Sequence, residues 1–296
     1  MLFEQARLDQ KARLDQLPRI TRARDFRLYG ADGKRYVDLW QFGGAAILGH
    51  NPPGVLRELK NTAERGLFAP LPTHLEARFF KALAKLLPGY SFYVYADEYS
   101  LHRVLSDVGF SGAGCPIRSI FDPALGDEHN EESGETVSLW RPFLPMEDTP
   151  SCPLLMPVLP WHLAPKTLAV RNEAFPFEAA RPPVSDAVSP VILAAATRAI
   201  YDLLAEIGDE AQAGARTAQP VSRFPALAKA LKSSEWQRKG VYLRYGGRLD
   251  DAGYPALFRR FLEAGFLLPP APHQPAILPP VLSAGEEAKL AALIRE

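Results

Sequence analysis

The spacing of apolar residues predicts a helix and a β-hairpin in the first forty residues. Over residues 2–17, apolar side chains recur every three to four positions among charged ones, and Pro18 ends this helical pattern. From Ile20 to Leu39 the residues alternate as in strands, with Asp32-Gly33 between two such runs. Asp-Gly between alternating runs is typical of a hairpin turn.

Helical and extended patterns alternate over the next sixty residues. Residues 52–65 and 73–87 have helical spacing, and Thr73 with Glu76 has the pattern of a capping box. Residues 91–96, SFYVYA, have the length and composition of a strand, and residues 98–108 predict another helix. We therefore expect a helix pair, a strand and a helix.

Residues 109–187 carry much of the chain's proline, of which there are 28 in total. Proline and glycine interrupt both helices and ladders, so here we expect extended strands, PLLMPVL and TLAV, joined by long loops.

The remaining residues predict a compact α/β layer. A long helix is expected over 189–207 and another over 224–239. They precede a strand (VYLRY), a helix over 251–264 ended by Gly265, two strands (FLLPP and PAILPP) and a last helix. Ser283 and Glu286 form a capping-box pattern at the start of that helix. A second layer must cover the other face of such a sheet.

Composition indicates a globular, cytoplasmic protein. Hydrophobic residues make up 47% of the 296 residues and charged residues 23%. Equal numbers of basic and acidic residues, 34 each, produce no overall field that would favour nucleic acid or an anionic membrane. No stretch is apolar enough for a signal peptide or a membrane span. Cys115 and Cys152 allow at most one disulfide, and we expect them reduced.

Three segments resemble class III pyridoxal-phosphate (PLP) aminotransferases. Residues 26–59, FRLYGADGKRYVDLWQFGGAAILGHNPPGVLREL, contain a hairpin, a Tyr-x-Asp strand, glycines and Leu-Gly-His-x-x-Pro in the family's order. VSPVILAAATRAI is similar to the stretch that leads into the helix linking the family's two domains. LEAGFLLPP and AILPPVLSAGEE resemble its closing segment.

The resemblance implies a reduced PLP-transferase architecture and a homodimer. A small α/β domain would comprise residues 1–65 and 225–296, and a truncated, proline-rich remnant of the large cofactor domain would comprise residues 66–224. The chain is well short of the family's usual length, and the deficit falls in the large domain.

The family's cofactor motifs are not found. A Ser-Gly-x-Glu-Ala turn holds the cofactor phosphate in the family, but this sequence has VYADEYSLHRVL there, with Asp97 and Glu98 as carboxylates. An alternative alignment makes Asp97 the partner of the pyridine nitrogen, although the glycine and arginine that should follow are missing. Asp127-Glu128 has no strand before it and fits that role less well.

Lys166 is the candidate for the lysine that forms a Schiff base with PLP. It lies upstream of Ser189-Pro190, as the family order requires, and a lysine that enters a buried strand can have a lowered pKa. The glycines and proline that follow this lysine in the family do not follow Lys166, so an ordinary loop lysine is the competing interpretation.

No metal site is expected. The acidic stretch at 127–135 lacks the spacing of a calcium loop, and no histidine stands at ligand spacing from another histidine or a cysteine. A solvated loop explains the acidic stretch.

The sequence therefore supports three functional hypotheses. The first is an aminotransferase relative that has lost PLP catalysis, binds no cofactor, and acts as a binding or regulatory protein, with a second protein subunit as a further partner. The second is an active PLP-dependent aminotransferase or aminomutase with a rearranged site that uses Lys166 and Asp97. The third is a small-molecule binding protein with a remnant pocket at Trp40, Gly43 and Gly44.

Overall fold

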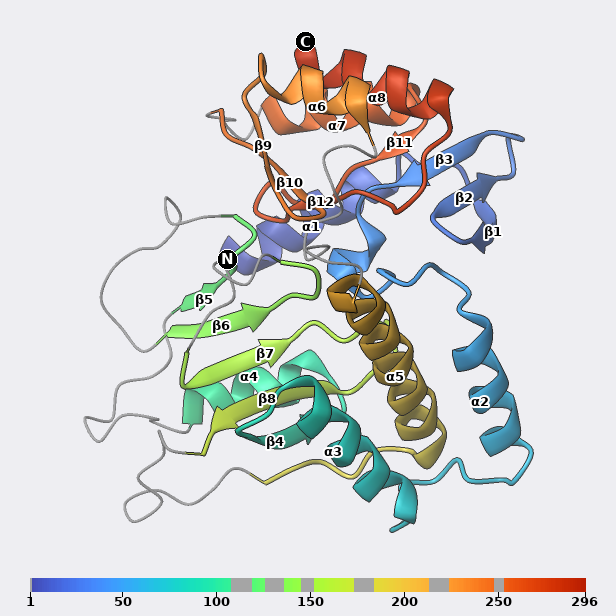
Figure 1. Ribbon diagram of the computed structural model, residues 1–296, viewed down its shortest axis with the longest axis vertical. Coiled ribbons are helices and arrows are strands. Elements are labelled where there is room, and N and C mark those ends of the chain that lie inside the picture. The colour runs from blue at the N-terminus through green and yellow to red at the C-terminus, as the bar shows by residue number, and fades with distance from the viewer. Residues whose placement is uncertain are drawn as a thin grey trace. The chain divides into compact units, whose positions relative to one another are not determined.

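The computed structural model describes residues 2–107, 119–125, 136–144, 152–172, 184–212, 224–247 and 253–296. They form the mixed α/β architecture drawn in Figure 1. The chain divides into two compact units. Unit 1 comprises Met1–Asn51, Phe143–Met146 and Glu210–Glu296, and unit 2 comprises Pro52–Pro142 and Glu147–Asp209.

The amino-terminal part of unit 1 is a helix followed by three strands. These elements are α1 (Leu2–Leu14), β1 (Ile20–Arg24), β2 (Arg27–Gly30) and β3 (Arg35–Asp38). The predicted hairpin is confirmed, since β2 and β3 pair antiparallel with Leu28 opposite Tyr36. Gly33 has a φ of +77°, a left-handed conformation that glycine adopts without strain.

The carboxyl-terminal part of unit 1 contains three helices and four short strands. They are α6 (Pro225–Leu231), β9 (Trp236–Lys239), β10 (Tyr242–Tyr245), α7 (Gly253–Glu263), β11 (Phe266–Leu267), β12 (Ala276–Ile277) and α8 (Ala284–Arg295). The helix predicted over 224–239 is wrong beyond Leu231. Residues 236–239 instead pair antiparallel with β10, and a cross-strand partner overrides local helical spacing.

The two ends of the chain share one sheet in unit 1. β11 lies parallel to β3, with Phe266 opposite Val37, and the strand order is β1-β2-β3-β11. β12 pairs with β10 in the second sheet, of order β12-β10-β9. The two short strands expected in one layer therefore lie in different sheets. Tyr242 of β10, the central strand of this sheet, is fully buried.

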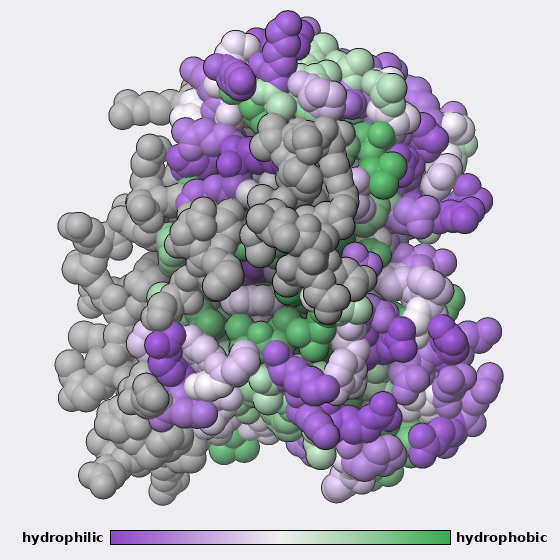
Figure 2. All heavy atoms as spheres, in the orientation of Figure 1, coloured by the Kyte–Doolittle hydropathy of each residue, from purple (hydrophilic) through white to green (hydrophobic). Residues whose placement is uncertain are grey.

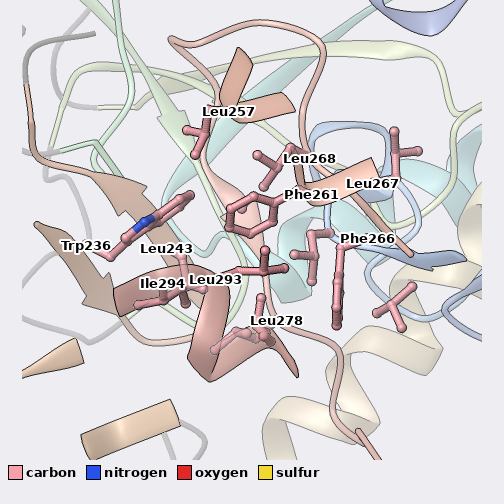
Figure 3. Close-up of a cluster of buried hydrophobic side chains, with 14 of the residues drawn as sticks. Trp236, Leu243, Leu257, Phe261, Phe266, Leu267, Leu268, Leu278, Leu293 and Ile294 are labelled. Atoms are coloured by element: carbon pink, nitrogen blue, oxygen red, sulfur yellow. The ribbon is translucent and has the colours of Figure 1, made fainter. Parts of the chain in front are cut away.

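A single apolar cluster joins these elements. Trp236, Phe261 and Phe266 lie within it, and α7 and α8 contribute leucines and an isoleucine from their buried faces (Figure 3). The capping box at α8 is confirmed, with Ser283 and Glu286 bonding each other's backbone N–H groups. Gly265 ends α7 with a φ of +90°, as predicted.

Unit 2 is built from a five-stranded sheet and helices. Its elements are α2 (Pro53–Ala63), α3 (His74–Leu86), β4 (Tyr90–Tyr95), α4 (Glu98–Asp107), β5 (Ser119–Phe121), β6 (Thr136–Trp140), β7 (Leu154–Pro157), β8 (Lys166–Arg171) and most of α5 (Pro190–Gln212). Thr73 is the N-cap of α3 as expected, but its hydroxyl accepts the N–H of Leu75 and not that of Glu76.

The sheet of unit 2 has the strand order β4-β8-β7-β6-β5. β5, β6 and β7 are mutually parallel, and β8 is antiparallel to both β7 and β4, so β4 runs with the parallel strands. Leu101 and Leu105 of α4 pack on Leu168 and Val170 of β8, so α4 covers one face. Two of these strands, β5 and β6, were not anticipated; they are three and five residues long.

The sequence-based domain boundaries remain a prediction, and the compact units place α2 in unit 2. On the side shown in Figure 2, hydrophilic residues cover much of the described surface. Among the described helices, none is long and apolar enough to cross a bilayer.

Candidate functional site

The carboxyl ends of β4, β5, β6 and β7 lie at one edge of the unit 2 sheet. Ligands of α/β proteins bind at such an edge, so the residues that follow these strands are the first candidates for a site. Ala96 and Asp97 follow β4, Asp122 follows β5, Arg141 follows β6, and Val158 follows β7. β8, which runs the other way, begins at this edge with Lys166.

Two carboxylates at the turn between β4 and α4 accept hydrogen bonds from backbone N–H groups. Asp97 Oδ1 accepts the backbone N–H of Ser100 at 2.8 Å, and this bond lowers the pKa of the Asp97 carboxyl. The N–H of Ala96 donates to Asp186 Oδ2 at 3.0 Å. Glu98, exposed, begins α4. Two backbone donors at this helix start, the N–H groups of Ala96 and Ser100, are therefore already bonded to side chains of the protein.

A buried ion pair joins the ends of β5 and β6. Arg141 Nε donates to Asp122 Oδ1 at 2.7 Å, and Arg141 Nη2 donates to Asp122 Oδ2 at 2.6 Å. The exposed fractions of the two side chains are 4% and 11%. The N–H of Ala124 also donates to Asp122 Oδ1. Such a bidentate, charge-assisted pair holds both groups in one geometry.

Lys166 is exposed at the start of β8. The ladder places it opposite Tyr95, the last residue of β4, so Lys166 and Asp97 lie at the same edge of the sheet. Lys166 shares the sheet face of Leu168 and Val170, which α4 covers. The structure thus brings the two sequence candidates into one region, without an ion pair between them among the described contacts.

Tyr95 is a further polar group at this edge. Its side chain is 1% exposed, and its hydroxyl has no hydrogen-bond partner among the described residues. Burial, together with the nearby Asp186, raises the pKa of Tyr95 to about 12. The hydroxyl therefore stays protonated at neutral pH.

Sequence reasoning missed Asp122 and Arg141. The signal for Asp122 was present, because a short apolar strand, SIF, runs directly into Asp-Pro. No local signal marks Arg141 as its partner, since the two residues meet only through the parallel pairing of β5 and β6. The acidic stretch at 127–135 and Cys115 lie outside the described residues.

The proposed remnant pocket lies in a strained loop of unit 1. Gln41 and Phe42 have φ values of 47° and 51°, and Gly43 and Gly44 also have positive φ. Non-glycine residues adopt this conformation rarely and at a cost in free energy. Phe42 is 49% exposed and stacks on Trp40 at 4.5 Å between ring centroids.

A buried carboxylate holds this loop. Asp38 is fully buried and accepts the N–H groups of Trp40 and Gln41 at 2.8 and 2.9 Å. His50 Nε2 lies 2.8 Å from the other oxygen of Asp38. Trp40 Nε1 donates to Gln274 Oε1, so the indole N–H is already bonded.

In the described part of the chain, no group of three His, Cys, Asp or Glu side chains could hold a metal ion.

Comparison with known proteins identifies the fold. No protein-family model matches the chain. It is 28% identical over 301 residues to an uncharacterised protein of Treponema pallidum, covering 88% of this chain and 89% of that protein. Glutamate-1-semialdehyde 2,1-aminomutase of Sorangium cellulosum is 42% identical over 69 residues, which are 23% of this chain and 16% of that enzyme.

Several aminotransferases are among the solved structures that match. Ornithine aminotransferase of Plasmodium yoelii superposes with a TM-score of 0.65 and 13% identity, over 93% of this chain and 92% of that chain. The fold expected from the resemblance, an α/β aminotransferase architecture, is thus confirmed. At this level of identity the comparison establishes the fold.

The described residues of the carboxyl edge do not fit the PLP that the fold family implies. A phosphate at the start of α4 would meet Asp97 and Glu98, and the N–H groups of Ala96 and Ser100 are engaged. Asp122, the carboxylate that directly follows a short strand, is held by Arg141. Lys166, which begins β8 at this edge, is exposed, whereas a reactive amine is favoured by desolvation.

Proposed function

We propose that this protein is a binding or regulatory protein on an aminotransferase fold that does not carry out PLP-dependent catalysis. The observation that carries the proposal is the buried Asp122–Arg141 ion pair at the carboxyl edge of the sheet. The resemblance implies an Asp as the partner of the pyridine nitrogen of PLP, and Arg141 already neutralises Asp122 through two hydrogen bonds.

The electrostatics of the β4–α4 turn support the same proposal. Asp97, Glu98 and Asp186 place three carboxylates around the start of α4, where the resemblance puts the cofactor phosphate. Like charges within a few ångströms disfavour a dianion in this position. The lowered pKa of Asp97 keeps that carboxylate ionised at neutral pH.

The visible absorbance spectrum tests this proposal. The purified protein is mixed with PLP, dialysed and treated with borohydride. We expect free PLP to be removed by dialysis and no reduced imine to stay on the protein. A shifted band that survives dialysis and is fixed by borohydride would overturn the proposal.

An active enzyme with a rearranged site is the second candidate. It is favoured by one observation, the placement of Lys166 and Asp97 at the same edge of adjacent strands. Under this alternative, Lys166→Ala removes the borohydride-reducible adduct. Lys81→Ala, an exposed lysine on α3, is the matched control and retains it.

Small-molecule binding at Trp40, Gly43 and Gly44 is the third candidate. The strained loop and the exposed Phe42 stacked on Trp40 favour it. A ligand that binds the folded state raises the melting temperature, and Trp40→Ala would abolish the increase if the site is here. An increase that persists in this variant would exclude the loop.

We also propose a homodimer. Phe68, Leu71 and Tyr99 of unit 2 are 62%, 62% and 77% exposed, and a second copy of the chain would cover such side chains. Light scattering on the purified chain measures the mass directly, and a monomer at micromolar concentration would contradict the proposal. A second protein subunit and a cytoplasmic location remain predictions, as does the absence of nucleic-acid binding.

A further inference from the structure

A cavity of about 740 Å³ lies in unit 1, remote in sequence from the carboxyl-edge residues. It is lined by the turn between α6 and β9, by strands β9 and β10, by one side of α7 and by the end of α8. Its volume is within the range typical of small-molecule sites, about 300–1,000 Å³. Neither the fold comparison nor the resemblance assigns a role to this cavity.

The cavity has an apolar floor. Trp236, Leu257 and Ile294 line it with exposed fractions of 6%, 8% and 2%, and Figure 3 shows all three at one end of the apolar cluster of unit 1. Tyr245 adds a second ring, edge-on to Trp236 at 5.5 Å between centroids. A flat apolar ligand body can therefore contact rings and aliphatic side chains together.

Cationic side chains outnumber anionic ones around this floor. Lys232, Arg260 and Arg295 line the cavity, as do Glu235 and Glu296. Glu235 is engaged because it accepts the hydroxyl of Tyr245. Within the described residues, Lys232 and Arg295 have no ion-pair partner, and the five charged side chains that line the cavity leave one net positive charge for an anionic group.

Arg260 is positioned beside the cavity by contacts with the end of α8. Its Nη2 donates to the carbonyl of Leu293 at 3.2 Å, and its Nη1 is 3.7 Å from Glu296 Oε2. Its Nε is buried and has no hydrogen-bond partner among the described residues. The side chain as a whole is 37% exposed, so the guanidinium places its charge at the surface of the cavity.

We propose that this cavity binds an aromatic carboxylic acid. The ring of the ligand lies on Trp236, Leu257 and Ile294, and its carboxylate pairs with Lys232, Arg260 and Arg295. Inorganic phosphate lacks the apolar body that this floor accommodates, and a neutral aromatic compound leaves the cations unpaired. The inference rests on the proposed function in one respect: the cavity would hold the ligand of the binding protein proposed above.

Isothermal titration of the purified full chain with naphthoate tests the proposal. We expect saturable binding with one molecule per chain and at least about tenfold weaker binding of the neutral analogue naphthalenemethanol. Naphthoate that does not bind, or that binds no better than the neutral analogue, would overturn the proposal. Displacement of naphthoate by inorganic phosphate at equal concentration would also overturn it.

Variants locate the site. The double variant Lys232→Ala/Arg295→Ala is expected to weaken naphthoate binding about tenfold without changing the melting temperature, because both side chains are exposed. Ala256→Trp places a ring in the cavity from an exposed position of α7 and is expected to abolish binding. Lys289→Ala, an exposed lysine of α8 that does not line the cavity, is the matched control. Unchanged binding in the first two variants would overturn the assignment.

The naphthoate titration and the absorbance experiment on the proposed function have independent outcomes. A PLP adduct in the absorbance experiment would refute the loss of catalysis without affecting naphthoate binding in unit 1. Failure of naphthoate to bind would refute the cavity assignment and leave the absorbance result unchanged.

Discussion

At the residue scale, Asp122 and Arg141 form an ion pair that is far less exposed than the pair of Arg198 and Asp202. Both side chains are nearly buried, and two short hydrogen bonds join them. Removing one member of a buried ion pair leaves the other charge desolvated and unpaired, which is more costly than losing an exposed pair.

Arg141→Met therefore destabilises the fold strongly. We expect a loss of about 3–5 kcal/mol in the free energy of unfolding, measured by urea denaturation. The double variant Arg141→Met/Asp122→Leu is expected to recover most of that loss, because neither charge is then buried. Arg198→Met breaks the more exposed pair with Asp202 and serves as the control, at less than about 1 kcal/mol. Equal losses in Arg141→Met and Arg198→Met would contradict this reasoning.

At the element scale, the start of α8 is held by one carboxylate with several partners. Glu286 accepts Arg27 Nη2 at 2.7 Å, Arg35 Nη2 at 3.1 Å and the N–H of Ser283 at 2.8 Å. Burial would raise the pKa of Glu286, but the hydrogen bonds from Arg27 and Ser283 lower it to about 2. The hairpin of β2 and β3 is thus joined to α8.

The stability of this junction depends on pH. Because the folded-state pKa of Glu286 lies below its ordinary value, the contribution is present above about pH 4.5 and is lost as pH falls towards 2. After allowance for solvent screening, Glu286→Gln is expected to cost about 1–2 kcal/mol at pH 7, and the difference from wild type shrinks at pH 3. Thermal unfolding at both pH values measures it.

Glu263→Gln is the control for that experiment, since Glu263 is exposed at the end of α7. We expect this variant to match wild type at both pH values. A Glu286→Gln variant whose deficit is the same at pH 7 and pH 3 would show that the ion pairs with Arg27 and Arg35 do not carry the effect.

At the scale of the whole molecule, stability is expected to be independent of PLP. A ligand at a hundredfold excess over its dissociation constant stabilises the folded state by about 2.7 kcal/mol. A gain of that size raises the melting temperature of a chain of this length by several degrees. We expect saturating PLP to leave the melting temperature unchanged, as measured by calorimetry, and an increase of several degrees would contradict the proposed function.

The sequence by itself determined the elements whose signals are local. Three such signals act within a few residues and could be predicted without a structure. They are the capping box of Ser283 and Glu286, the glycine at 265 and the Asp32-Gly33 turn. The order of motifs was also sufficient to predict the aminotransferase architecture, which the comparison with solved structures confirms.

Only the tertiary structure decided the arrangements that depend on strand pairing. Residues 236–239 form β9 because β10 lies beside them, and Asp122 meets Arg141 because β5 and β6 are parallel neighbours. The cavity of unit 1 likewise assembles from α7, α8 and the turn after α6, which lie far apart in the chain. The physical reason is that a strand ladder or a buried ion pair joins residues distant in sequence. The local sequence around one residue does not identify the residue that pairs with it.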